Sequence, residues 1–480
     1  MQEIFKSSIF LRWLTAFFSW VGVMWHRSRI VSWFLSPGRG RALTDNSVFS
    51  KLFGKLHGAV CVVFEKLRLN RLFEGSIFKQ AFFGCLLPAV LAPFLPTMVV
   101  LCLVIVGVFT LFVRFGTDRS LRLFYSPVNK YILLFCAVYL VATLTSVTVS
   151  GSLFTGLITV LFALFAIAFD NAVTTKKQAD LAVRLIVVAG TAVALYGIYQ
   201  YIFYNPATAG AWVDSDMFSG ITNRVYSTLG NPNVLSEYLL LVMPFAAACV
   251  LTGKTWWQRV FFLCCLAVMA VCMIVTFSRG GYLGLILAAV IFIVMLDARF
   301  ILLGIVALVA LYFFLPQTVT ERFSSIGNLS DSSTSYRVYI WMGTIAMLKD
   351  YWFSGIGPGT NAFNLIYPAY SYNTIAAPHA HNLFLQIMCD SGIVGLILFV
   401  AILFSYYRRT FTAFSRTRDK TSRTYLIAAI ASVSAFLLQG MTDYAFYNNC
   451  VMLLFWIFIG LGAIMARRPE MEEGPLWLKS

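Results

Sequence analysis

The sequence contains little charge. Asp, Glu, Lys and Arg make up 12% of its 480 residues, whereas hydrophobic residues make up 60%. A soluble protein of this length needs a larger charged surface, and apolar runs of about 20 residues, long enough to cross a bilayer, recur along the chain. The composition therefore excludes a soluble protein and predicts an integral membrane protein.

Metal-binding cysteine patterns and a cleavable leader are also missing. The ten cysteines form no CxxC pair and no Cys/His spacing suited to zinc, so we expect neither a disulfide framework nor a zinc site. The first apolar stretch contains Arg12 and lacks a small-residue cleavage site. We therefore expect no cleaved signal peptide.

The hydrophobic runs predict an all-α fold with about twelve transmembrane helices. The first two runs contain Pro88, Pro93 and Pro96, and they fit either a hairpin of two short helices or one long kinked helix. The predicted spans are 81–94, 96–114, 128–147, 152–170, 179–203, 232–251, 256–277, 281–296, 299–316, 383–407, 423–442 and 449–466.

The distribution of basic residues favours the hairpin. With the N-terminus in the cytoplasm and two helices in the hairpin, 31 of the 36 Lys and Arg residues lie on the cytoplasmic side. This agrees with the positive-inside rule, so we expect a multi-pass protein of the cytoplasmic membrane with both termini in the cytoplasm. The net charge of +16 then reports topology and attraction to anionic lipids, and we expect no nucleic-acid partner.

The spans divide the chain into five parts. Residues 1–80 form a basic, aromatic arm that we expect to lie as an interfacial helix on the cytoplasmic leaflet, with a thirteenth span as the alternative. Residues 81–316 hold spans one to nine, and residues 317–382 form an extracytoplasmic loop. Residues 383–466 hold spans ten to twelve, and residues 467–480 form a cytoplasmic tail.

Within the long loop, apolar residues repeat at helical spacing. They predict an amphipathic helix that lies on the membrane or on the bundle, with residues 331–333 as possible helix caps. The repeating residues are Val338, Trp341, Met342, Ile345 and Leu348.

Four arginines on the outer side oppose the positive-inside bias. Arg224 precedes span six, Arg279 lies between spans seven and eight, and Arg322 and Arg337 lie in the long loop. A guanidinium presents a rigid set of donors suited to phosphate, so Arg224, Arg279 and Arg337 are candidate ligands for a lipid-linked pyrophosphate. Arg322 has Glu321 beside it as a structural partner and is a supporting candidate.

Histidine is scarce, and two of the four histidines lie close together in the sequence. Two of the four histidines, His379 and His381, lie just before span ten. A positioned imidazole can take a proton from an attacking hydroxyl, whereas the structural alternative is a helix cap or a headgroup contact. The pair at the end of the longest outer loop favours catalysis, but residue chemistry alone does not rank the two.

Two other patterns fit structural roles better. Asp214 and Asp216 have the DxD form by which some glycosyltransferases hold a metal, but such triplets arise often by chance and a solvated loop explains them. The stretch GIGPGT, from Gly355 to Thr360, follows no predicted strand, so we interpret it as turns that end the loop helix. We expect no metal site.

The residues that follow His381, the second histidine of the pair, carry a family resemblance. His381-Asn382, a spacer of nine residues and the GIVG stretch from Gly392 to Gly395 resemble the signature of the O-antigen ligase and O-antigen polymerase superfamily of membrane glycan transferases. The segments RVYSTLGNPN, FSRGG, SYRVYIW and GIGPGTNAF are also similar to that family. The resemblance covers roughly residues 80–466, and Asp390 stands where many relatives carry Glu.

This resemblance implies a GT-C-like bundle that acts at the outer face of the membrane without a metal or other cofactor. A hydroxyl of a glycan, lipid or polymer acceptor attacks the anomeric carbon of a glycan on polyprenyl pyrophosphate. The configuration inverts and polyprenyl pyrophosphate leaves, in a step of cell-surface polysaccharide assembly. The matched motifs imply that His381 is the general base and that Arg224 and Arg279 bind the diphosphate.

The remaining candidates have lesser roles under this resemblance. Arg337 assists the two diphosphate-binding arginines, and the supporting candidates are His379, Asn382 and Arg322. Gly392 and Gly395 are expected to let span ten pack closely against its neighbours.

Three alternatives stay open. Ligases and polymerases share these motifs, so a polysaccharide polymerase would use the same site. A bicarbonate or small-solute transporter is the alternative of another class, and it would rely on an ionisable residue near the bilayer midplane, such as Asp390. A structural membrane protein would leave the outer arginines unexplained.

Overall fold

The computed structural model describes residues 48–121, 126–203, 224–314, 317–324 and 332–476, together with residues 27–35 and a few isolated positions before them. Every regular element in these ranges is a helix, which confirms the all-α prediction. Ten described helices are long and apolar enough to cross a membrane. They coincide with ten of the predicted spans, whereas 81–94 and 299–316 form shorter helices. All ten cysteines are free.

The ten long helices are α8 (Thr97–Thr117), α9 (Pro127–Leu144), α10 (Val149–Ala172), α11 (Lys176–Phe203), α12 (Pro232–Thr252), α13 (Trp256–Val275), α14 (Arg279–Asp297), α19 (Leu383–Arg416), α20 (Lys420–Gly440) and α21 (Asn449–Arg467). The other α-helices are α3 (Arg29–Leu35), α5 (Val48–Lys66), α6 (Leu69–Leu72), α7 (Ala81–Leu91), α15 (Ile301–Phe314), α16 (Gln317–Ser324), α17 (Ser332–Tyr351) and α18 (Thr360–Ile366). The 3₁₀ turns are η1 (Ile77–Lys79), η2 (Ala92–Phe94), η4 (Ala298–Phe300), η5 (Tyr367–Ala369), η6 (Tyr372–Thr374), η7 (Ala445–Tyr447) and η8 (Arg468–Glu470).

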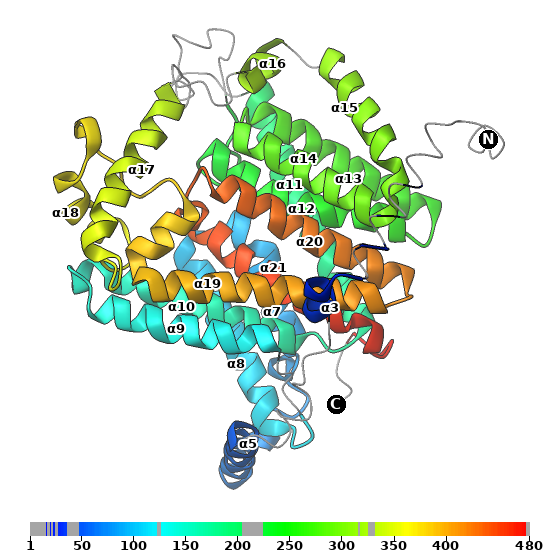
Figure 1. Cartoon of the computed structure of the whole chain (residues 1–480). Helices are drawn as coiled ribbons and strands as arrows, with labels where there is room; N and C mark the ends of the chain where they lie inside the picture. The colour runs from blue at the N-terminus through cyan, green and yellow to red at the C-terminus, as the bar shows by residue number, and fades with distance from the viewer. Residues whose placement is uncertain are drawn as a thin grey trace.

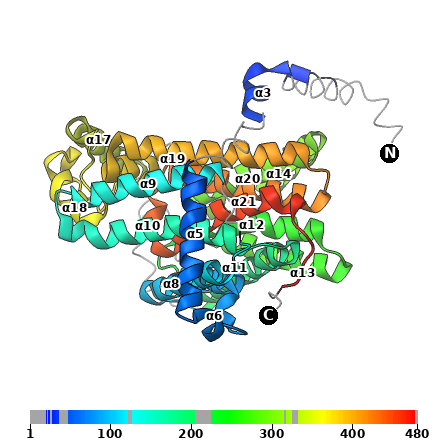
Figure 2. The ribbon, with the colours of Figure 1, turned by 90° about the horizontal axis from the view of Figure 1, so that it is seen from below.

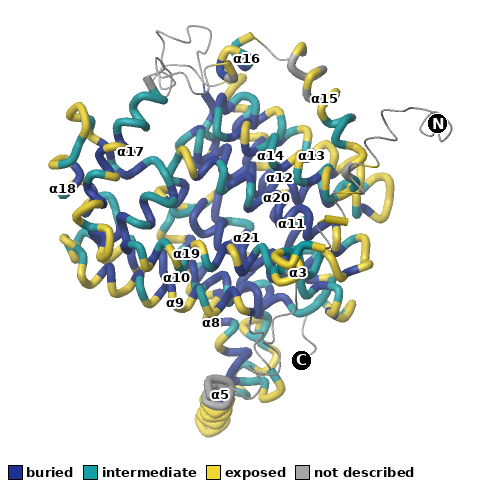
Figure 3. The backbone as a smooth tube through the Cα atoms, viewed as in Figure 1, coloured by how far each residue is buried: buried dark blue, intermediate teal, exposed yellow. Residues whose placement is uncertain are grey.

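Helices α12, α20 and α21 form the centre of the bundle (Figure 1). Helix α12 packs against α20 and α13, α14 packs against α20, α10 against α21, and α9 against α19. Buried residues concentrate on the central helices, whereas the outer helices expose apolar side chains (Figure 3). Exposed apolar surface on long helices is what a bilayer requires, because lipid tails solvate it.

Helices α7 and α8 form the predicted hairpin. Pro96 stands directly before α8, where a proline fits because its missing N–H needs no partner. The two helices touch at small residues: a Cβ on Gly84 would overlap Thr110, and the Cys85 thiol donates to the Gly107 carbonyl. The contact between positions on either side of Pro96 confirms two antiparallel helices.

The N-terminal arm contains the helix α5, which docks on α8. The His57 Nε2 atom lies 2.9 Å from the Phe115 carbonyl oxygen, and Phe64 packs on Gly116. Figure 2 shows α5 running across the direction of α9 and α10. Its position on the cytoplasmic leaflet stays a prediction, and residues 36–47 lie outside the described residues.

The loop before α19 forms a small unit of its own at one end of the bundle, on the left of Figure 1. The predicted helix is present as α17, but its buried face differs from the predicted apolar stripe. Of the predicted stripe, Leu348 is buried, whereas Met342 and Ile345 are exposed. Helix α17 turns Ile340, Met347 and Leu348 into a small core that it shares with α18 and the following turns. The predicted cap at Asp331 lies outside the described residues.

Helix α19 bends at Gly392 where it meets this unit. Gly392 has φ 66° and ψ −172°, and a Cβ there would overlap the Phe353 carbonyl oxygen. The segment after α17 pairs with the break, since the Ile393 N–H donates to the Trp352 carbonyl at 2.8 Å and the Ile356 N–H to the Cys389 carbonyl at 2.7 Å. The break therefore fastens the end of α17 to α19.

Candidate functional site

His381 adopts a backbone conformation that few residues with a side chain occupy. Its φ is 45°, in the left-handed region. The His381 N–H donates to Nδ1 of His379 at 3.2 Å, and the Trp341 indole N–H donates to the His381 carbonyl at 3.2 Å. Strained conformations held by neighbours in this way cluster at functional sites.

Asn382 ties the start of α19 to the loop between α20 and α21. Its side-chain oxygen caps α19 by accepting from the Phe384 and Leu385 N–H groups. Its amide nitrogen donates to the Met441 carbonyl at 2.7 Å. The same residue therefore begins α19 and brings the α20–α21 loop, which contains Asp443, beside the histidines.

Asp443 orients the imidazole of His381. Oδ1 of Asp443 lies 3.3 Å from the Nδ1 atom, and Oδ2 lies 3.9 Å from the Arg337 guanidinium. Burial alone would raise the pKa of Asp443, but the hydrogen bond with His381 and the charge of Arg337 outweigh it and hold that pKa below its ordinary value. A carboxylate only accepts, so in the neutral form of the ring Nδ1 carries the proton and Nε2 can accept one. No described residue hydrogen-bonds to this Nε2 atom.

Asn233, at the start of α12, extends the connection to the arginines. Its amide nitrogen donates to Oδ2 of Asp443 at 2.9 Å, and its oxygen accepts from Nη2 of Arg224 at 3.0 Å. The Arg224 Nε–H also donates to the Thr276 carbonyl at 2.8 Å. A hydrogen-bonded path thus runs from His381 through Asp443 and Asn233 to Arg224.

The four outer arginines lie within electrostatic range of one another. Burial, together with the nearby charges of Arg322, Arg337 and Arg279, lowers the pKa of Arg224 to about 9. Arg224 stays charged at neutral pH and belongs to a group of like charges. Such a group binds an anion well, because a bound phosphate relieves the repulsion and accepts charged hydrogen bonds.

Arg279 and Arg322 approach this group from two further helices. Arg279 is the first residue of α14, and a Cβ on Gly281 would lie 2.7 Å from the Ser236 Cβ, so glycine allows α14 to begin against α12. Arg322 lies on α16 and is only 5% exposed. A long cation this deeply buried needs anionic or polar contacts.

His379 and His381 differ in environment, which ranks them. Burial, followed by the neighbouring His381, lowers the pKa of His379 to about 3, so His379 is neutral at physiological pH. Its ring lies 4.2 Å from that of His381 and 4.8 Å from that of Tyr447. His379 therefore positions the loop, and His381 is the better placed of the two to exchange a proton.

Asp390 lies apart from this group and has structural partners. The Tyr139 hydroxyl donates to one carboxylate oxygen at 2.6 Å, and the Gln386 amide donates to the other at 2.8 Å. Gln386 in turn accepts from the Ala380 N–H at 2.7 Å. The carboxylate thus joins α9, α19 and the histidine loop.

The sequence-predicted residues converge, and two unpredicted residues join them. The structure brings Arg224, Arg279, Arg322, Arg337 and His381 to one end of the bundle. Asp443 and Asn233 were not predicted as site residues. Asn233 lies in the family-like segment RVYSTLGNPN, and Asp443 lies in the last outer loop. These two positions are the sequence signals that could have identified them as partners of the site.

Within the described ranges, no three His, Cys, Asp or Glu residues stand close enough to hold a metal ion. Asp214 and Asp216 lie outside those ranges.

One family of known proteins matches part of the chain. The family model described as O-antigen ligase matches residues 264–400. No curated protein matches the chain significantly. The matched segment contains Arg279, Arg322, Arg337 and His381, whereas Arg224 and Asp443 lie on either side of it.

Proposed function

We propose that the chain is an inverting, metal-independent membrane glycosyltransferase, because residues 264–400 match the family model of the O-antigen ligases. It moves a glycan from polyprenyl pyrophosphate to an acceptor hydroxyl at the outer face of the cytoplasmic membrane. This reaction needs a base for the hydroxyl and cations for the diphosphate leaving group.

The observation that supports the proposal is the hydrogen-bonded path between the candidate base, His381, and a candidate diphosphate ligand, Arg224. His381 contacts Asp443, Asp443 accepts from Asn233, and Asn233 accepts from Arg224. A base oriented by a carboxylate is a recurring arrangement in hydrolases and transferases, since the carboxylate sets the imidazole tautomer. Here the same path ends at a cation suited to phosphate.

His381 acts on the acceptor. Its Nε2 atom takes the proton as the acceptor oxygen forms a bond with the anomeric carbon of the donor, and Asp443 stabilises the imidazolium that results. The bond between the anomeric carbon and the diphosphate oxygen breaks on the opposite face. The bonding electrons leave with polyprenyl pyrophosphate.

The arginines act on the leaving group. Arg224 and Arg279 bind the diphosphate and Arg337 assists them, so charge that develops on the departing oxygen meets cations that are already in place. The supporting residues keep this geometry: Asn382 caps α19, His379 holds the His381 backbone, and Arg322 adds positive charge.

The test of the base is transfer by purified protein carrying His381→Ala, with a polyprenyl-diphosphate glycan as donor. We expect the turnover rate to fall about 10²- to 10⁴-fold, the usual contribution of a positioned general base. His57→Ala is the matched control, because His57 lies on α5 and should leave the rate within about twofold of wild type. Undiminished transfer by His381→Ala would remove this assignment.

The diphosphate site is tested with Arg224→Lys and Arg279→Lys. Lysine retains the charge but loses the bidentate donor geometry, so we expect donor KM to rise about tenfold, the effect of losing one charged hydrogen bond. Arg418→Lys, on the exposed loop after α19, is the control. Wild-type donor KM in both site variants would contradict a diphosphate-binding role.

A further inference from the structure

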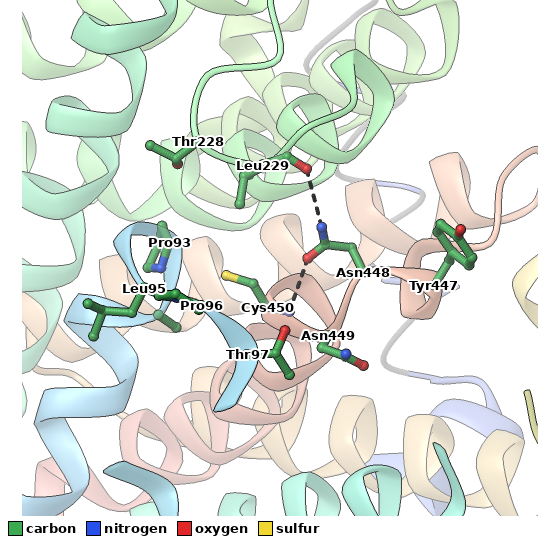
Figure 4. A pocket seen from close by; sticks show the side chains of 11 residues that line it. Pro93, Leu95, Pro96, Thr97, Thr228, Leu229, Tyr447, Asn448, Asn449 and Cys450 are labelled. Atoms are coloured by element: carbon green, nitrogen blue, oxygen red, sulfur yellow. Dashed lines mark hydrogen bonds between the residues drawn. The ribbon is translucent and has the colours of Figure 1, made fainter. Parts of the chain in front are cut away.

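A cavity of about 470 Å³ lies beside the site, between the α7–α8 turn, the segment before α12 and the start of α21. Its size is within the range of small-molecule sites, about 300–1,000 Å³. Figure 4 shows the side chains that line it. The lining residues are Ala92, Pro93, Leu95, Pro96, Thr97, Thr228, Leu229, Tyr447, Asn448, Asn449 and Cys450.

The lining contains polar groups but no charged side chain. Among the described residues, none hydrogen-bonds to the side chains of Thr97, Thr228 and Asn449. Asn448 is already engaged, because it caps α21 and donates to the Leu229 carbonyl. Uncharged donors and acceptors without a partner suit a neutral ligand rich in hydroxyl groups, whereas a diphosphate would need cations.

Tyr447 adds an aromatic wall to this cavity. Its side chain is 55% exposed, and its ring lies 4.8 Å from the ring of His379. An exposed tyrosine offers a flat apolar face together with a hydroxyl group, a combination that suits the mixed polar and apolar faces of a sugar ring. Through this contact, a residue that lines the cavity touches the His379–His381 pair directly.

Two chain segments connect the cavity with the proposed reaction centre. The first runs from Arg224 to Thr228, a distance of at most about 14 Å for four residues of extended chain. The second runs from Asp443 to Cys450. The first segment is rigid, because the Ser227 N–H donates to Gln200 at 2.7 Å and the Ser227 hydroxyl donates to the Val193 carbonyl at 2.6 Å.

We propose that this cavity binds the neutral sugar end of the acceptor on the His379 side of the base, while the arginines hold the diphosphate of the donor. The inference rests on the proposed function, in which His381 needs an acceptor hydroxyl delivered to it. A polyprenyl chain is a poorer occupant, since burying the unpartnered hydroxyls and amide against hydrocarbon is costly.

The kinetic test fills the cavity with Thr228→Trp, at an exposed position of its rim. In nanodiscs, with donor and acceptor fractions extracted from the host cell and titrated separately, acceptor KM rises more than about tenfold and donor KM is unchanged. Thr228→Val removes one hydroxyl and raises acceptor KM about threefold. Thr145→Trp, at the exposed threonine that caps the C-terminus of α9, changes neither constant. An unchanged acceptor KM in Thr228→Trp overturns the proposal.

A binding test separates this inference from the proposed function. Thr228→Cys is made in a background without the ten native cysteines, and its alkylation rate is measured with and without oligosaccharides released from the host polysaccharide. Protection of at least about threefold, absent in the Thr145→Cys control, supports the sugar site even if no transfer is observed. Equal alkylation rates overturn the sugar site, whereas missing transfer by wild-type protein overturns the proposed function alone.

Discussion

Asn233 is an uncharged residue that connects the histidine side of the site with Arg224. Its amide donates to Asp443 and accepts from Arg224, so it relates an anion and a cation without a direct ion pair between them. A direct pair would offset the charge of Arg224, so an intervening amide agrees with the proposal that Arg224 binds a diphosphate. Because the Asn233 amide can donate only through its nitrogen and accept only through its oxygen, its orientation between Asp443 and Arg224 is fixed.

Asp443 is the residue with which we test the orientation of the base. In Asp443→Asn, loss of the adjacent anion disfavours the imidazolium form of His381 and allows the wrong tautomer. We expect the turnover rate to fall about 10²-fold or more while donor KM changes little. The measurement is steady-state transfer with purified protein.

Asp350→Asn is the matched control for this prediction. Asp350 lies on α17 and accepts from the Tyr370 hydroxyl at 2.6 Å, away from the histidines. Its variant should transfer at close to the wild-type rate. Equal rates for the Asp443 and Asp350 variants would contradict an orienting role for Asp443.

The residue types of the site were predictable, but their partners were not. Arg224, Arg279 and Arg337 stand out because cations on the outer side oppose a known bias, and His381 stands out because histidine is scarce. His381 and Asp443 are 62 positions apart, and Asn233 and Asp443 are 210 positions apart. No local pattern relates residues at such separations.

Among the helices, α19 does the most to position the site. It begins at Asn382, next to the histidines, and its break at Gly392 receives the end of α17. Helix α17 contains Arg337, so the break joins the helix that carries this arginine to the helix that begins beside His381. The GxxG pattern in the sequence predicted close packing of span ten, but the positive φ of Gly392 follows from the contact with Phe353.

Gly392→Ala tests the importance of this break. The new methyl group would overlap the Phe353 carbonyl oxygen, and the left-handed backbone disfavours any Cβ. We expect a loss of stability of at least about 2 kcal/mol and a fall in transfer activity. The thermal midpoint in detergent measures the first effect.

Gly54→Ala is the control, since a Cβ at Gly54 on α5 meets nothing within 4 Å. Its thermal midpoint should equal or exceed the wild-type value, because alanine favours a helix. A Gly392→Ala protein as stable and active as wild type would show that the break is dispensable.

The two ends of the bundle use charge differently. At the end away from the site, arginines pair closely with carboxylates: Arg467 lies 3.1 Å from Asp170, and Arg468 lies 2.9 Å from both Asp180 and Asp419. At the site end, Arg337 stands 3.9 Å from Asp443. The first end holds helices together, and the looser pairing at the second agrees with the proposed diphosphate site.

The orientation of the whole bundle gives a further prediction. If the site end faces outward, as the positive-inside rule requires, Ala376→Cys should react with a membrane-impermeant maleimide in intact cells. Arg418→Cys, which lies on the opposite exposed loop, should react only after the cells are opened. The background lacks the ten native cysteines. Labelling of Arg418→Cys alone in intact cells would invert the topology.

The amino-acid sequence alone determined the class of the protein, the positions of ten long spans, the α7–α8 hairpin and the scarcity of cations on one side. These are properties of local composition, because a bilayer acts on each apolar run and each loop charge separately. Only the tertiary structure decided which histidine faces Asp443, how Asn233 reaches Arg224, and which face of α17 is buried. Those relations depend on helices that meet after folding, when the packing of α12, α19 and α20 brings distant residues within hydrogen-bonding distance.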